Sequence, residues 1–389
     1  MAVNTMGIEQ AYTLIADLHE QATGQKAVTP TDLSSFISVA QSTLQNGYEP
    51  VLNAISQVIS KTLIAVRPYD RKFKGLEVSN EQWGGIIRKI SFGDKDPVVN
   101  PTFELVDGAS VDMFEVAKPN VLETRYVGSN VWSQTITIFR NQLDLAFTGP
   151  QEFANFMSGL MVHFNNLRTQ YLEELARASL SNLIGAKNEL GGENVIHLLT
   201  EYNTATGLSL TATTVRQPAN FPAFTRWLYA RVEEVSKLMT ERSQLFQQVI
   251  NGHKIMRHTP VVDQRVYISS DILAHMQAEV LADTYHDNYL SLAETESVNY
   301  WQAIKDPNKV EVTPVYIDAD AKVVTGTAQT VDNVIGVIFD RDAIGYNIYH
   351  DTIDTTPYNP RGEYYNLIAN MRVQYQNDLT EKSVVLLLD

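Results

Sequence analysis

The longest regular pattern in this chain lies near its middle and predicts one helix over residues 150–184. Pro150 suits a first helical position, Glu152 suits the positive end of the helix dipole, and Gly185 supplies a stop. Large apolar residues recur between them at helical spacing: Phe153, Phe156, Met157, Leu160, Met161, Phe164, Leu167, Tyr171, Leu172, Leu175, Leu180, Leu183 and Ile184. Such a helix would be about 50 Å long at about 1.5 Å per residue. That length favours a flat, elongated subunit over a compact enzyme.

The C-terminal region predicts two strands. Residues 364–376 and 383–388 are rich in β-forming side chains and are joined by Asn377 and Asp378. We expect both strands to belong to a sheet shared with an earlier part of the chain.

The N-terminal region reads as short helices within residues 7–64, separated by breaks at 24–30 and at Gly47. Their apolar stripes are narrow, and the segment has little chain of its own to cover them. We therefore expect an arm that packs on something outside itself.

Residues 74–147 change to strand-like pieces divided by turn residues, with an alternating run over 131–138. This pattern predicts an extended hairpin. Its tip, placed at Ser91 to Asn100, is expected to carry few large apolar residues and to project from the body.

The remaining segment predicts a mixed lobe of helices and strands. Residues 186–220 read as a loop or polar hairpin, and 222–250 read as a helix with a wide apolar face. Strands are expected at 264–269, 310–317 and 334–339, with a helix opening at Ser270. Together with the long helix, the fold class is α+β.

Composition narrows the possible functions. The 389 residues include no cysteine, which excludes disulfides and thiolate chemistry, and no apolar stretch approaches the roughly 20 residues that span a bilayer. The N-terminus lacks a signal-peptide pattern, so we expect a cytoplasmic protein that acts where it is made. Lys and Arg total 30 against 45 Asp and Glu, and this net charge of −15 disfavours tight nucleic-acid binding.

Residues 71–89 form a locally basic stretch. Two acidic residues there, Glu77 and Glu81, are outnumbered by five basic ones: Arg71, Lys72, Lys74, Arg88 and Lys89. An ordinary solvated face and a docking patch for an acidic neighbour remain equally open.

Motifs for catalysis or cofactor binding are absent from the sequence. It contains no Walker A loop, dinucleotide fingerprint, G-x-S-x-G elbow, H-E-x-x-H or EF-hand loop. One group could be an acid/base or metal cluster, although a polar helix end is the favoured interpretation: His275, Asp283, His286 and Asp287. We predict no catalytic residues, no cofactor and no metal.

Two segments together resemble a known family. They are WSQTITIFRNQLDLAFTGPQEFANFMSGLMVHFNN at 132–166 and IGYNIYHDTIDTTPYNPRGEYYNLIANMRVQYQNDLTEKSVVLLLD at 344–389. In element order, residues 60–389 resemble the major capsid proteins of phi-29-like podophages. The turn Asn359-Pro360-Arg361-Gly362 with its following tyrosines is the part that is specific at the level of individual residues.

The resemblance implies the Hong Kong 97-like capsid fold of tailed phages. Residues 1–65 would be a helical N-terminal arm and 66–130 the extended loop. Residues 131–185 and 350–389 would form the peripheral domain with spine helix 150–184, and 186–349 the axial domain.

The resemblance also implies partners. Many copies of the chain would form pentamers and hexamers of an icosahedral or prolate shell that encloses double-stranded DNA without sequence-specific binding. A portal protein and a separate scaffolding protein are expected, with assembly in the host bacterial cytoplasm and no membrane partner. The predicted intersubunit contacts are Arg71, Lys72, Lys74, Arg88, Lys89, Asp354, Tyr358, Asn359 and Arg361.

Two other functions remain open at this point. An encapsulin-like compartment shell would share the fold and package a cargo enzyme. A soluble acidic enzyme with dispersed catalytic residues would form a small defined oligomer instead of megadalton particles.

Overall fold

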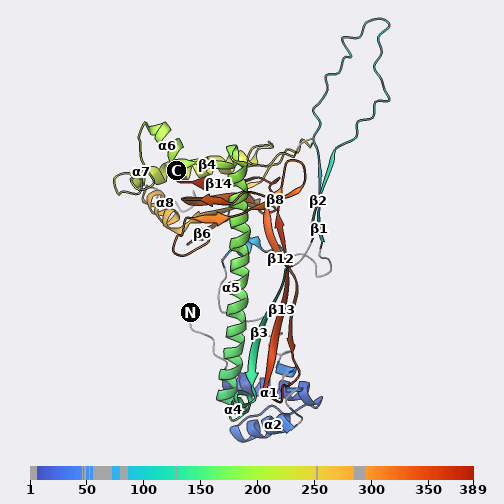
Figure 1. The fold of residues 1–389 in the computed structure, drawn as a ribbon, viewed down its shortest axis with the longest axis vertical. Helices are drawn as coiled ribbons and strands as arrows, with labels where there is room; N and C mark the ends of the chain where they lie inside the picture. The colour runs from blue at the N-terminus through green and yellow to red at the C-terminus, as the bar shows by residue number, and fades with distance from the viewer. Residues whose placement is uncertain are drawn as a thin grey trace.

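Helix α5 (Pro150–Leu190) runs almost the full length of the body and organises the rest of the chain (Figure 1). A lobe of sheets and helices surrounds one end of it, the N-terminal helices pack at the other end, and a narrow hairpin projects past the lobe. The computed structural model describes residues 7–45, 47, 50–51, 53–55, 72–78, 86–127, 130–250, 253–283 and 294–389.

The start of α5 agrees with the prediction, but its predicted end is wrong. Pro150 opens the helix, which continues for 41 residues, about 60 Å, until Gly191 at φ 60°. Gly185 lies inside the helix. A larger residue would not fit at this position, because a Cβ there would come 2.3 Å from Cγ1 of Val312. This glycine allows a strand to approach the helix closely and does not stop it.

A three-stranded antiparallel sheet lies along α5, in the order β12 (Ile344–Thr355), β13 (Tyr364–Asn377) and β3 (Asn130–Phe139). Alternate residues of these strands face the helix. The Trp132 ring stacks on that of Tyr171 with centroids 4.2 Å apart, and Arg168 pairs with Asp351 at 2.6 Å. The sheet and the helix together form a stiff stalk.

The two N-terminal helices and α4 pack against the lower end of this stalk. Helices α1 (Ile8–Thr23), α2 (Leu33–Gln45) and α4 (Arg140–Ala146) bury their apolar faces against α5. Phe36 is fully buried, with its ring 5.9 Å from that of Phe153. This confirms the prediction that the N-terminal stripes pack outside their own segment. Most of the third predicted stripe, at 52–63, lies outside the described residues.

The lobe contains a five-stranded sheet in the order β4-β14-β11-β5-β6. These strands are β4 (Val195–His197), β14 (Ser383–Leu387), β11 (Val334–Asp340), β5 (Gln264–Ser269) and β6 (Glu294–Val298). Both faces are buried, so its strands read as nearly continuous apolar runs. The two predicted C-terminal strands therefore lie in different sheets, which corrects the expectation of a single one.

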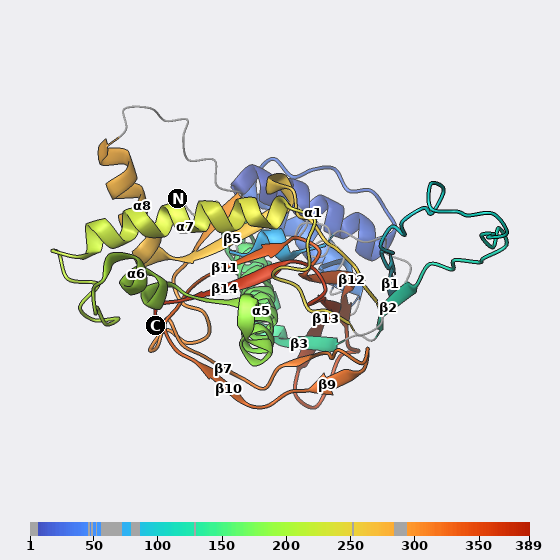
Figure 2. The same ribbon diagram turned by 90° about the horizontal axis from the view of Figure 1, so that it is seen from above.

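Helices α6 (Leu198–Thr206), α7 (Phe221–Thr240) and α8 (Ser270–Asp283) cover one face of the lobe sheet (Figure 2). The upper part of α5 and the stalk sheet cover its other face. Two predictions are wrong here. Residues 186–220 include β4 and α6, and α7 ends at Thr240, after which Ser243 and Arg257 form an isolated bridge.

The remaining elements are short. They are β7 (Val310–Val312) paired with β10 (Gln329–Val331), β8 (Val315–Ile317) paired with β9 (Val323–Thr325), and the 3-10 turns η1 (Lys74–Leu76), η2 (Gly192–Asn194) and η3 (Val261–Asp263).

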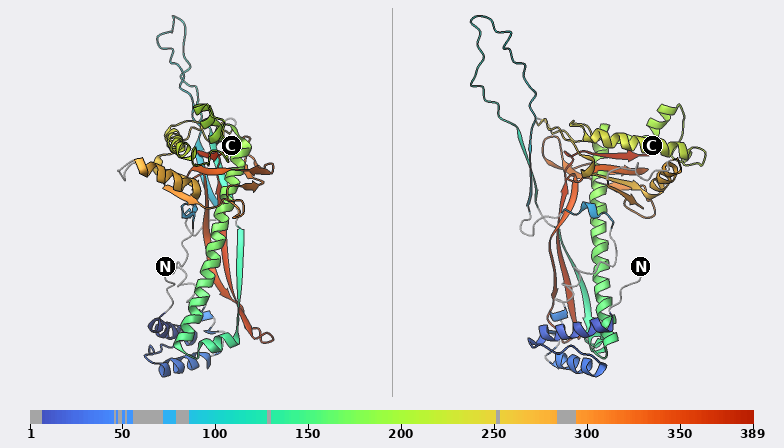
Figure 3. Two further views of the ribbon diagram at one scale, coloured as in Figure 1. Left: turned by 90° about the vertical axis from the view of Figure 1, so that its left-hand side faces the viewer. Right: turned by 180° about the vertical axis from the view of Figure 1, so that it is seen from behind.

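An extended hairpin is present as predicted, but it is shorter than residues 74–147, because β3 joins the stalk sheet and residues 140–146 form α4. Strands β1 (Ile86–Phe92) and β2 (Val121–Val127) pair antiparallel, and residues 93–120 between them contain no strand. This loop extends away from the lobe in every view (Figure 3).

Candidate intersubunit surfaces

The projecting loop, residues 93–120, is the most unusual surface of the molecule. Seven of its large apolar side chains are each at least 74% exposed: Val98, Val99, Phe103, Val106, Met113, Phe114 and Val116. Residues 97–117 also carry four acidic side chains and no basic one. Water contact with so many apolar groups is unfavourable, so this composition is typical of a surface that a partner covers.

Sequence reasoning missed these apolar side chains. The expected tip was placed at Ser91 to Asn100 and described as poor in large apolar residues, whereas Val98 and Val99 already contradict that description. The available signal was a run of valine, phenylalanine and methionine that fits neither helical nor strand spacing.

The basic stretch divides between exposed and buried positions. Arg88 is exposed and pairs across the hairpin with Glu123 at 2.8 Å, and Arg125 contacts the same carboxylate at 2.6 Å. Arg125 and Arg88 lower the pKa of Glu123 to about 2.

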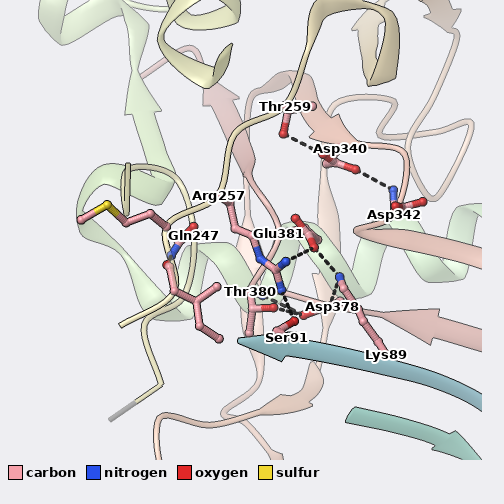
Figure 4. Close-up of polar contacts among 12 residues, drawn as sticks. Lys89, Ser91, Gln247, Arg257, Thr259, Asp340, Asp342, Asp378, Thr380 and Glu381 are labelled. Atoms are coloured by element: carbon pink, nitrogen blue, oxygen red, sulfur yellow. Dashed lines mark hydrogen bonds and ion pairs between the residues drawn. The ribbon is translucent and has the colours of Figure 1, made fainter. Parts of the chain in front are cut away.

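Lys89, the next residue, points the opposite way, into the body. Its ammonium pairs with Asp378 at 2.5 Å and with Glu381 (Figure 4). The acidic partners of Lys89 are thus in its own chain. Its role as an intersubunit contact stays a prediction.

The other predicted cations are less informative. Lys72 is half-buried beside Phe73, whose backbone N–H donates to Glu296 at 2.6 Å. The backbone of Lys74 forms part of η1, and Arg71 lies outside the described residues.

The four remaining predicted contacts, Asp354, Tyr358, Asn359 and Arg361, lie at or beside the turn between β12 and β13, close to the N-terminal helices. Asn359 holds the turn: its Oδ1 accepts from the backbone N–H groups of Arg361 (3.1 Å) and Gly362 (3.3 Å). Its Nδ2 donates to the hydroxyl of Tyr364 at 3.0 Å. The turn presents Arg361 to solvent, so Asn359 shapes this surface and Arg361 is the group available for contact.

Asp354 and Tyr358 flank this turn. Asp354 is exposed and accepts from Asn370 at 3.2 Å. The ring of Tyr358 packs 4.8 Å from that of Tyr365 and contacts the core beneath the N-terminal helices. Among the predicted contacts at this turn, Asp354 and Arg361 are therefore the exposed side chains.

A buried lysine sits at the upper end of α5. The ammonium of Lys187 donates to Oδ1 of Asn194 at 2.9 Å and to the carbonyl of Phe246 at 3.0 Å. Burial lowers its pKa to about 7, although the nearby Asp378 opposes this shift. Both contacts fasten loops to the helix end, which is a structural use of the lysine.

No arrangement for metal chemistry occurs within the described part of the chain. No group of three His, Asp or Glu side chains there could hold a metal ion. His275 packs its ring 4.7 Å from that of Phe221, whereas the side chain of Asp283 and residues His286 and Asp287 are not described. None of the helices described is long and apolar enough to cross a membrane.

The fold defines the class of protein. The chain is similar to a capsid chain of Staphylococcus phage Andhra, with 13% identity, a TM-score of 0.57, and coverage of 84% of this chain and 86% of that one. It is also similar to a chain in the structure of the head fiber and inner core protein gp22 of native bacteriophage P68, with 13% identity, a TM-score of 0.56, and coverage of 82% and 85%. The fold is the Hong Kong 97-like fold of tailed-phage capsid subunits.

The family follows from the sequence. The profile of the Phi29-like phage major capsid protein matches residues 14–387, and the chain belongs to this family. No curated protein sequence matches it. The chain is therefore a structural subunit of a phage shell, a role that involves no catalysis, and the expected family and fold are confirmed.

Proposed function

We propose that copies of this chain form pentamers and hexamers of a closed icosahedral or prolate shell around double-stranded DNA. Residues 1–65 would act as the arm, 66–130 as the extended loop, 131–185 with 350–389 as the peripheral domain, and 186–349 as the axial domain. The strand pairing supports one change to these limits, because β14 pairs within the lobe sheet and fits the axial domain.

The observation that carries this proposal is the projecting loop 93–120. The loop reaches beyond the described body of its own subunit (Figure 1), and its large apolar side chains are left exposed to solvent. We propose that the loop lies over a neighbouring copy, on a surface with apolar and cationic groups that suit its acidic character.

The turn between β12 and β13 would supply a second contact, through Arg361 and Asp354. Arg361→Glu reverses the charge of an exposed side chain without touching the hydrogen bonds of Asn359. The expected result is fewer closed particles with unchanged subunit stability. Lys322→Glu, an exposed residue in the turn after β8, is the matched control and should assemble as the unsubstituted chain does. Equal particle yields for both variants would contradict a contact at Arg361.

A separate scaffolding protein and a portal protein would complete the assembly, in the host bacterial cytoplasm. Negative-stain microscopy of the chain expressed alone tests this requirement. The expected products are open, tubular or wrongly sized particles. Uniform closed shells from the chain alone would show that no separate scaffold is needed, and small oligomers alone would argue against shell formation altogether.

A further inference from the structure

The root of the projecting hairpin is held by a cluster of buried charges. Lys89 of β1 is only 21% exposed and lies between the carboxylates of Asp378 and Glu381, in the turn between β13 and β14. Arg257 reaches the same Glu381 at 3.3 Å and donates to the hydroxyl of Ser91 at 2.7 Å (Figure 4). These four charged residues, Lys89, Arg257, Asp378 and Glu381, are called the inner anchor.

The charges of the inner anchor balance, two positive against two negative. Although burial opposes its charge, the carboxylates of Asp378 and Glu381 raise the pKa of Lys89. Asp378 also accepts from the hydroxyl of Thr380 at 2.6 Å. A buried ion cluster of this kind contributes little net stability but is costly to break, because the remaining charges lose their partners. It favours one arrangement of the hairpin over others.

A second set of ion pairs lies where the loop begins. Asp94 pairs with Arg242, and Asp96 pairs with Lys254, both from the segment that follows α7. Asp94 additionally accepts from the backbone N–H of Met256 at 3.0 Å. These residues, Asp94, Asp96, Arg242 and Lys254, are called the outer anchor.

Backbone hydrogen bonds complete the attachment. The backbone N–H of Gly93 donates to the backbone carbonyl of Asn120 at 2.7 Å and closes the base of the loop. The backbone N–H of Asp94 donates to the backbone carbonyl of Lys254 at 2.5 Å. On the other strand, Gln374 donates to the carbonyl of Tyr126 at 2.5 Å. Both strands of the hairpin are therefore fastened to the body.

An isolated two-stranded hairpin is marginally stable in water, and the exposed loop of this one supplies no core. Its direction must therefore come from its root or from a neighbour. We propose that the inner and outer anchors set the direction of hairpin β1–β2 within each single subunit, before any neighbour binds. The anchors are positioning groups that present the apolar loop ready for contact, and this inference does not depend on the shell contacts proposed above.

The absence of cysteine makes a direct test practical, because introduced cysteines can be spin-labelled selectively. Val121→Cys at the outer end of β2 and Ala178→Cys on the exposed side of α5 report the direction of the hairpin. Ala178→Cys with Ala205→Cys on α6 reports the body alone. Distance distributions are measured by double electron–electron resonance on the full chain, at a concentration where sedimentation finds single subunits.

In the unsubstituted background, the expected result is a narrow distribution for both label pairs. Lys89→Gln is expected to widen the hairpin distribution at least about twofold and leave the body distribution unchanged, since it releases local structure only. Arg88→Gln is the matched control: it removes the same charge from the adjacent residue, whose partner Glu123 lies within the hairpin. It should leave both distributions narrow.

The proposal is wrong if the hairpin distribution is already broad without substitution, if it stays narrow in Lys89→Gln, or if Arg88→Gln widens it equally. Lys89→Gln could instead disturb the lobe, which the body pair would reveal. In that case Asp94→Asn decides the question, because it weakens the outer anchor at the loop base without creating a buried charge. If Asp94→Asn widens the distance distribution of the hairpin pair and leaves that of the body pair unchanged, the proposal is supported. If the distribution of the hairpin pair stays narrow, the proposal is overturned.

Discussion

The two ends of α5 are stabilised in different ways. At the lower end, the N-terminal helices bury apolar side chains such as Ile15 and Phe36 against one side of the helix, and its other side stays open to solvent. At the upper end, residues 183–187 are buried on all sides, and charged groups hold the surrounding loops. The buried apolar contacts hold the N-terminal helices on their own subunit, whereas the charged attachment lets the hairpin leave the body in one direction with its apolar loop uncovered.

The largest effect is expected at the lower end. Phe36→Ala removes a fully buried ring that contacts Tyr12 and Phe153, and should cost about 3–5 kcal/mol because the cavity cannot close completely. Hydrogen exchange should become much faster in residues 8–45 and stay unchanged in β1 and β2. Leu33→Ala, on the same helix but 53% exposed, should change stability by less than about 0.5 kcal/mol. If exchange accelerated equally in the hairpin, the two ends would not be independent.

Two glycines of α5 compare its ends directly. Gly185→Ala at the upper end should destabilise by about 1–3 kcal/mol, because the new methyl group would collide with Val312. Gly159→Ala at the lower end meets no atom within 4 Å and should stabilise by about 0.5–1 kcal/mol through higher helix propensity. Urea unfolding of the unassembled subunit measures both. The same sign for both substitutions would contradict the difference in packing.

Lys187 predicts a pH dependence that belongs to the upper end. Its pKa is about 7 in the fold and 10.5 for an ordinary lysine, so the unfolded chain binds more protons between these values. Stability should therefore rise with pH from about 7 to about 10.5, by up to about 1.4 kcal/mol per unit from this group. Lys187→Met should have a flatter stability profile over that range than the unsubstituted chain. Parallel profiles would mean that Lys187 stays charged when buried.

The smallest effect on subunit stability is expected from the projecting loop. Phe103→Ser with Phe114→Ser should change the free energy of unfolding by less than about 0.5 kcal/mol, because both rings are already in water. Shell yield by electron microscopy should nevertheless fall sharply if a neighbour covers these rings. If this variant formed normal shells, the rings of Phe103 and Phe114 would not be assembly contacts.

Much of the fold could be predicted because it depends on local patterns. The spacing of apolar residues and Pro150 identified α5, strand-like alternation identified β3, and a run of β-forming residues identified β13. The end of α5 could not be predicted in the same way. A glycine after an apolar run looks the same whether it stops a helix or admits a strand, and only the position of Val312 distinguishes the two.

The candidate surfaces show the same limit. Asn359 and Arg361 were identified through the family resemblance, and the structure separates the residue that shapes the turn from the one that is exposed. Lys89 was correctly seen as part of a basic stretch, but its partners Asp378 and Glu381 are almost 300 residues away in the sequence.

The amino-acid sequence by itself determined the main elements, the α+β class and the family, because helical spacing, turn residues and family-specific segments are local properties. The tertiary structure decided which sheet each C-terminal strand joins, which charges are satisfied within the subunit, and which apolar side chains remain uncovered. Those outcomes depend on distances between residues far apart in the chain. The approach of Val312 to Gly185 and the pairing of Lys89 with Asp378 are two examples.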